Sequence, residues 1–373
     1  MISDNDFRQG EDQPELVAWA QQEPPVPASL PTEEIAGLLE SLVSKSLVRL
    51  TERSEPPRFM LLETIREYAL ERLAESGEEQ ATRWRHAGYY TWWHDTINSW
   101  THLRGIAAVE DELENFRALL SWCIESGEVL PGLIIGADFT LWGERANEGR
   151  QWLAALLSQP VPLSHAAAYA WYSAAFLAIS TYDYPAARAA LDTSFQMHAQ
   201  FGEPTYLKYF GLGFIALGEG DVAGAGRLFE QFLVHADEPT NPNRDDTVAW
   251  AHVGLGAYDL MAGSLAEAQT HLEASLTFFR ATSQIEPVAS TLNRLGFIAQ
   301  LQGDLRCSAS YFRESIELGQ TRHYRRNIST SLFSLAGVAL GQGKLEQAAQ
   351  LLDAAETLRE MTGGRDPDER YLV

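Results

Sequence analysis

The chain has 373 residues, 45% of them hydrophobic, which is enough to bury several cores or one domain followed by a repeat array. Fifty-one acidic residues against 28 Lys and Arg leave a formal net charge of −23, which repels a phosphate backbone and disfavours nucleic acid as a partner. Only Cys123 and Cys307 are present, so neither a disulfide framework nor a CxxC metal site is indicated.

The N-terminal segment indicates neither export nor membrane anchoring. It has no basic region followed by an apolar stretch, and no part of the chain reaches the roughly 18 apolar residues of a membrane span. We therefore expect a cytoplasmic protein that does not associate with membranes. Residues 1–32 are acidic and rich in Pro and Gln, a composition typical of a disordered arm.

Residues 33–78 have the outline of a small winged-helix domain. Apolar side chains recur at helical spacing up to Leu47 and then alternate with polar ones, as in a short strand. A turn rich in Pro precedes a second predicted strand at 58–62. Thr64 can cap the next helix, and Gly77 can end it.

An internal period of about 40 residues begins near residue 129. Bridging helices are expected at 79–128, and a tail at 362–373. Three copies place a Leu-Gly pair, a second Gly, a small residue and a bulky residue at matching positions, and a fourth copy replaces the first Gly by Ala336. The matched sets are Gly213, Gly256 and Gly296; Gly220, Gly263 and Gly303; Ala225, Ala268 and Ser308; and Phe229, Leu272 and Phe312.

This spacing predicts pairs of antiparallel helices. Small residues let the two helices of a pair approach closely while the bulky residue fills the gap between them. The second Gly ends the first helix because glycine tolerates a positive φ. We therefore expect a mainly α-helical protein: an α-solenoid of about six helix pairs over 129–361, similar to tetratricopeptide repeats (TPRs), preceded by the winged helix.

Both parts together resemble the C-terminal half of AfsR/LuxR-type bacterial signal-transducing NTPase regulators. The resemblance rests on LLESLVSKSLVRL, RFMLLETIREYALERLAESGE, VEDELENFRALLSW, EGRQWL and LLDAAETLREMTG, which span most of residues 38–363 in that order. It implies a winged helix that acts as an internal switch element and a TPR sensor array. No GxxxxGK[ST] motif is present, so the family's P-loop NTPase module is absent, and we expect a truncated regulator or a stand-alone remnant.

The sequence contains no catalytic motif that would indicate an enzyme, and no cofactor is expected. Repeat arrays bind extended ligands on the concave face formed by their first helices. The repeat register places Tyr169 there, together with the candidate partner-binding residues Tyr172, Phe176, Phe210, Phe214, Trp250, Asn293, Arg294 and Phe297. Arg294 could pair with a carboxylate of a protein, peptide or small effector, although some of the aromatic residues could instead pack between repeats.

Two further clusters of polar residues could bind a metal or a partner. His252, Asp259 and His271 could be imagined as a metal site, but surface or core positions on two helices of one repeat are the favoured interpretation, and we expect no metal. The basic segment 322–326 could bind an anionic partner or simply complement neighbouring acidic residues.

We therefore expect a non-catalytic regulatory or interaction module, part of a transcriptional or signalling regulator, that binds a partner in the concave groove. The alternative is a DNA-binding winged-helix transcription factor. Lys45 and Arg49 are the basic residues of its recognition helix, against three acidic residues nearby.

Overall fold

The structure is a computed structural model that describes residues 19, 32–51, 58–98, 110–322 and 324–362. The arm predicted at 1–32 and the tail at 362–373 lie almost wholly outside these residues. The chain divides near Trp92 into two compact units, and helix α4 (Glu79–Asn98) contributes to both.

The N-terminal unit contains a helix, a two-stranded hairpin and a second helix, in the predicted order. Helix α2 spans Thr32–Ser44, strands β1 (Val48–Thr51) and β2 (Arg58–Leu61) pair antiparallel, and helix α3 spans Glu63–Ser76. Gly77 ends α3 with a φ of 77°, as expected. The assignment of these elements to a winged helix remains a prediction.

The cap expected from Thr64 is wrong. Helix α3 already begins at Glu63, its N-cap is Leu62, and no side chain caps it, so Thr64 lies within the first turn. In the following helix α4, Trp84 is buried and stacks on Trp19, with ring centroids 4.1 Å apart. The two indole rings exclude water from each other and fix Trp19 against α4.

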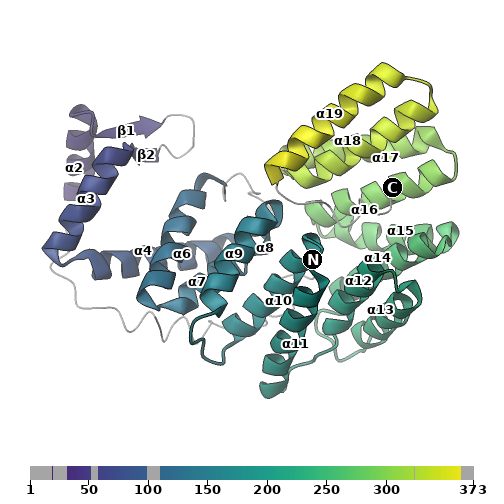
Figure 1. Ribbon diagram of the computed structural model, residues 1–373, viewed down its shortest axis with the longest axis horizontal. Coiled ribbons are helices and arrows are strands. Elements are labelled where there is room, and N and C mark those ends of the chain that lie inside the picture. The colour runs from purple at the N-terminus through teal and green to yellow at the C-terminus, as the bar shows by residue number, and fades with distance from the viewer. Residues whose placement is uncertain (1–18, 20–31, 52–57, 99–109, 323, 363–373) are drawn as a thin grey trace. The chain divides into compact units, whose positions relative to one another are not determined.

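The second unit is an array of helices (Figure 1). It begins with α6 (Leu113–Ser126), α7 (Val129–Gly136), α8 (Phe139–Trp142), a 3-10 turn η2 (Gly143–Arg145) and α9 (Ala146–Leu157). Five antiparallel pairs follow: α10 (His165–Ser180) with α11 (Tyr184–Gln200), α12 (Lys208–Glu219) with α13 (Val222–Ala236), α14 (Arg244–Ala262) with α15 (Leu265–Ala281), α16 (Ile285–Leu301) with α17 (Leu305–Arg322), and α18 (Arg325–Gly341) with α19 (Leu345–Thr362). This is the predicted TPR-like solenoid.

Close packing of glycine against a bulky side chain occurs in the three pairs for which the sequence predicts it. A Cβ atom added at Gly213 would lie 2.5 Å from the ring of Phe229, and one at Gly296 would lie 2.7 Å from Phe312. Gly256 meets Leu272 in the same way, at 2.6 Å. Only a residue without Cβ permits these helix separations.

The mid-repeat glycines also have the predicted backbone conformation. Gly220, Gly263, Gly303 and Gly343 have φ values of 87°, 82°, 84° and 74°. Each lies at the end of a first helix, where a left-handed residue lets the chain reverse into the second helix.

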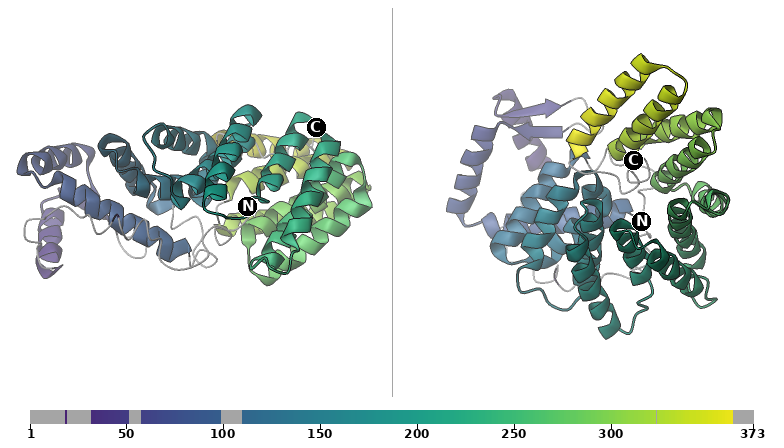
Figure 2. Two further views of the ribbon diagram at one scale, coloured as in Figure 1. Left: turned by 90° about the horizontal axis from the view of Figure 1, so that it is seen from below. Right: turned by 45° about the vertical axis from the view of Figure 1, so that its right-hand side comes forward.

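The first helices of successive pairs contact one another, from α10 to α12, α14, α16 and α18. Each second helix contacts the first helix of the next pair, and Figure 2 shows the pairs side by side from two directions. The first helices therefore line one side of the array, which we call the inner face. Among the described residues, no helix has both the length and the apolar character required to cross a membrane.

Candidate functional site

Aromatic side chains from three consecutive first helices meet along the inner face. Tyr172 and Phe176 of α10 have ring centroids 4.8 Å apart, and Phe176 lies 6.1 Å from Phe210 of α12. Phe210 in turn lies 5.0 Å from Phe214 and 5.9 Å from Trp250 of α14. These distances are typical of interacting aromatic pairs, so five of the eight predicted site residues form one continuous aromatic ladder.

Most of this ladder is buried. Phe210 exposes 2% of its surface, and Tyr172, Phe176 and Trp250 are also buried, whereas Phe214 is half-buried. Four of the rings therefore pack between repeats, as the sequence allowed for some of them. These are Tyr172, Phe176, Phe210 and Trp250. They shape the inner face from beneath, and Phe214 is the member of the ladder that contributes most to its surface.

Asn293 lies apart from the ladder, in a buried polar network. Its amide group donates to the backbone oxygen of Asn327 at 3.3 Å, and its side-chain oxygen accepts a hydrogen bond from Ser331 at 2.5 Å. The Ser331 hydroxyl lies 3.1 Å from that of Ser315, which donates to the Ala289 carbonyl. Because buried polar groups must be satisfied, these residues tie α16, α17 and α18 together.

The two remaining predicted residues also belong to α16. Arg294 is buried, with 9% of its surface exposed. Phe297 is half-buried and packs against the apolar clusters on both sides of α16, including Phe312. The half-buried rings of the predicted set are therefore Phe214 and Phe297, on two first helices separated by α14.

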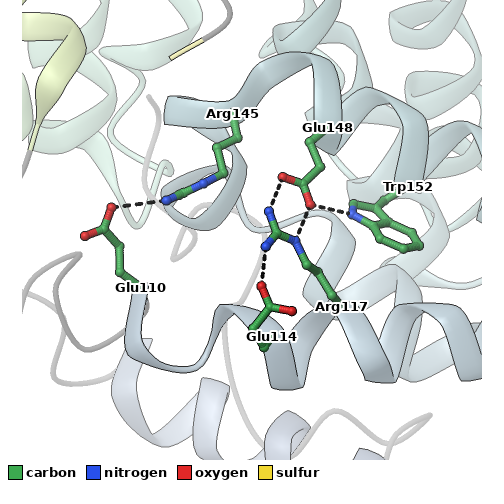
Figure 3. A network of polar contacts seen from close by, with 6 residues as sticks. All are labelled: Glu110, Glu114, Arg117, Arg145, Glu148 and Trp152. Atoms are coloured by element: carbon green, nitrogen blue, oxygen red, sulfur yellow. Dashed lines mark hydrogen bonds and ion pairs between the residues drawn. The ribbon is translucent and has the colours of Figure 1, made fainter. Parts of the chain in front are cut away.

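A second polar network joins α6 to α9 (Figure 3). Both oxygens of Glu148 accept hydrogen bonds from Arg117, at 2.6 and 2.7 Å, and Trp152 donates to Glu148 at 3.2 Å. Arg117 also donates to Glu114 at 2.5 Å. The hydrogen bonds from Arg117 hold the pKa of Glu148 below its ordinary value despite partial burial, so this bidentate pair remains ionised at neutral pH.

A third polar contact links residues that are far apart in the sequence. Glu110 accepts hydrogen bonds from Arg145 at 3.1 Å and from Arg325 at 2.6 Å. Arg325 belongs to the basic segment 322–326, so this segment complements an acidic residue, which is one of the two interpretations offered by the sequence. His323 of the same segment lies outside the described residues.

His252 and His271 face each other within one repeat. Their Nδ1 atoms lie 2.8 Å apart, so the N–H of one ring donates a hydrogen bond to the other, while His271 Nε2 lies 3.7 Å from Asp259. Burial and the electrostatic interaction with His271 lower the pKa of His252, and burial raises the pKa of Asp259. In the part of the chain that the structure describes, no group of three or more His, Cys, Asp or Glu side chains could hold a metal ion.

The polar residues around Arg117, Glu110 and Asn293 were not predicted as interacting groups. Glu148 and Arg117 lie in the EGRQWL and VEDELENFRALLSW blocks, so the family resemblance marked their positions without giving them a role. The contact between Glu110 and Arg325 spans 215 residues of sequence, and no local pattern could have revealed it.

Comparison with known proteins finds similarity to part of larger regulators, and no protein-family model matches the chain. The relatives are named "Putative HTH-type transcriptional regulator", one from Mycobacterium bovis and one from Mycobacterium tuberculosis. Each is 37% identical over 125 residues, which is 32% of this chain and 14% of the relative. The chain therefore matches only a small fraction of their length.

Solved structures with similar folds are helical repeat proteins. A Rap protein complexed with competence and sporulation factor has a TM-score of 0.50 and 13% identity, over 72% of this chain and 78% of that chain. The quorum sensor NprR from B. thuringiensis has a TM-score of 0.45 and 11% identity, over 87% and 99%. A STAND protein with a tetratricopeptide repeat sensor from Pyrococcus horikoshii has a TM-score of 0.47 and 13% identity, over 96% and 52%. These likenesses concern the fold alone.

Proposed function

We propose that this chain is a non-catalytic regulatory module that binds a protein or peptide on the inner face of its TPR-like array. The observation that carries the proposal is the aromatic ladder from Tyr172 to Trp250, which runs across three first helices. It gives the inner face a rigid floor, while the half-buried rings of Phe214 and Phe297 offer apolar contacts to a ligand. Large aromatic side chains with part of their surface exposed are frequent anchors in protein interfaces.

A peptide is the favoured ligand because the inner face is a series of parallel first helices that repeats along one direction. An extended chain can contact several repeats at once, whereas a compact molecule contacts one or two. The Rap protein, whose fold is similar, has been solved in complex with a factor, which is consistent with ligand binding by such an array. The partial match to regulators in mycobacteria supports a regulatory role.

A peptide library displayed on phage, selected against the full chain, tests the proposal. Peptides that bind should lose at least about tenfold in affinity when Phe214 and Phe297 are both replaced by Ala, because loss of an aromatic anchor costs more than about 1.4 kcal/mol. The matched control replaces Val234 and Leu345, which are exposed side chains on the second helices α13 and α19, and should leave binding unchanged. Equal loss in both variants, or no selected peptide, would contradict the proposal.

DNA binding by the N-terminal unit is a second candidate, favoured by the name of the mycobacterial relatives. Lys45 follows helix α2 and Arg49 lies within strand β1, so neither belongs to the recognition helix expected from the sequence. Both side chains are exposed and could approach a phosphate backbone. Gel shifts at low salt on the upstream sequences of its own operon would detect this activity. A shift that Lys45→Gln and Arg49→Gln together abolish would support it, and no shift would exclude it.

The finer assignment to the AfsR/LuxR-type regulators is also part of the proposal. Without a GxxxxGK[ST] motif, this chain should not bind ATP on its own. Calorimetric titration with Mg-ATP should therefore show no heat of binding, and a saturable signal would overturn the non-catalytic assignment.

A further inference from the structure

The first turn of α18 is held by residues that lie near the start of the array. Helix α18 begins at Arg325, and its N-cap Tyr324 provides no side-chain hydrogen bond to the free backbone amides. Instead, the backbone N–H of Arg326 donates to Glu144 Oε2 at 3.1 Å, across 182 residues of sequence. Glu144 thereby acts as a cap from a distant element, and its negative charge is favourable beside the positive end of the helix dipole.

The side chains around this cap form a second contact between the same elements. Glu110 lies between Arg145 and Arg325 and accepts a hydrogen bond from each. Glu110 and both arginines are about one-fifth to one-quarter exposed, so the pairs are only partly screened by solvent. One carboxylate therefore joins η2 to α18 by charge-assisted hydrogen bonds.

The electrostatics of the two acidic residues differ. Burial alone would raise the pKa of Glu110, but hydrogen bonds from Arg325 and Arg145 outweigh it and hold the pKa below its ordinary value. Burial raises the pKa of Glu144, and nearby Glu286 acts in the same direction, whereas Arg326 and Arg325 oppose the rise. A charged Glu144 is therefore costly wherever the first turn of α18 does not lie against it.

We propose that Glu110, Glu144, Arg145 and the first turn of α18 form an electrostatic latch that closes the array and sets the curvature of its inner face. Apolar side chains pack between neighbouring pairs along the array, whereas the hydrogen bonds that reach the first turn of α18 from Glu110 and Glu144 join charged and polar groups. Such a contact can open without disrupting a hydrophobic core. A ligand that prefers one curvature shifts the latch equilibrium by its difference in affinity for the two states.

Electron paramagnetic resonance distances in the full chain test the latch without any ligand, and so independently of the proposed function. Spin labels are attached at Gln151→Cys on α9 and Gln320→Cys on α17, both exposed positions, in a Cys307→Ser background. The distance between the labels reports the separation of the two sides of the latch. Wild type at low salt should give one narrow distance distribution. Glu110→Gln, Arg325→Gln and Glu144→Ala should each lengthen or broaden it. The Glu110→Gln, Arg325→Gln double variant should add nothing beyond Glu110→Gln alone, because that change already removes the partner of Arg325.

Arg188→Gln is the matched control, because Arg188 pairs with Glu219 at 2.8 Å between neighbouring repeats. It should leave the distribution as in wild type. Raising the salt to about 1 M, where the Debye length falls to about 3 Å, should shift wild type towards the latch variants and so provides a test that requires no variant to fold. Distributions unchanged by the latch variants and by salt would overturn the proposal, as would an equal change in the control.

Discussion

The packing of Gly213 against Phe229 provides a quantitative test of how the repeats are held together. In Gly213→Ala, the new Cβ would lie 2.5, 2.6 and 2.8 Å from three atoms of the Phe229 ring, far inside van der Waals contact. The ring has little room to move, because Phe229 is fully buried and Gly254 of the next repeat also lies so close that a Cβ there would be 2.3 Å from the same ring. One glycine from each of two first helices therefore lies against the same ring.

The expected loss of stability follows from two opposing effects. Overpacking a well-filled core costs about 1–3 kcal/mol, and this rigid site should lie at the upper end. In the opposite direction, alanine in place of a glycine within a helix raises the free energy of unfolding by about 1 kcal/mol. We therefore expect Gly213→Ala to lower the free energy of unfolding by about 1–2 kcal/mol, instead of raising it as glycine-to-alanine changes do in open helices.

Urea unfolding followed by far-ultraviolet circular dichroism measures this difference. Gly341→Ala is the control, because its Cβ would meet only the flexible end of Leu305 at 3.3 Å. It should leave the free energy of unfolding unchanged or raise it by up to about 1 kcal/mol. In a Phe229→Leu background the penalty of Gly213→Ala should shrink, because the smaller side chain leaves room. A urea midpoint for Gly213→Ala at or above that of wild type would refute the reasoning, as would a penalty that does not depend on Phe229.

Two further predictions concern titration and reactivity. Burial and His271 hold the pKa of His252 below its ordinary value, so the native state binds fewer protons than the unfolded chain below about pH 6.5, and stability should fall as the pH drops through this range. His252→Asn should flatten the dependence of the urea midpoint on pH between about 5 and 6.5, and an unchanged slope would contradict the assignment. Burial also raises the pKa of the Cys123 thiol, and the thiolate is the reactive form. A thiol reagent should therefore modify native protein at half-buried Cys307 and should reach Cys123 only after unfolding; fast labelling of a Cys307→Ser variant would disprove this.

The repeat architecture could be predicted from the sequence because its causes are local. A glycine that must adopt a positive φ and a small residue that must face a bulky one recur at fixed spacing. Gly220 therefore indicates the end of a helix, and Gly213 indicates a close contact between two helices. The same register placed Tyr172, Phe176, Phe210 and Trp250 on first helices, and these rings do meet.

The degree of burial of these rings depends on the tertiary structure. Helical register gives a direction for each side chain, but the separation and curvature of neighbouring pairs decide whether a ring such as Phe210 reaches solvent or fills the space between repeats. Register likewise could not show that Asn293 is satisfied by Ser331 of a later helix.

Charge composition determined that this protein is acidic, and the repeat pattern determined that it is a solenoid. Neither could reveal where its polar side chains find partners. Glu110 and Arg325 are 215 residues apart, and they meet because the small rotations between successive helix pairs accumulate along the array. Such contacts follow from the sum of many packing geometries, so only the tertiary structure decides them.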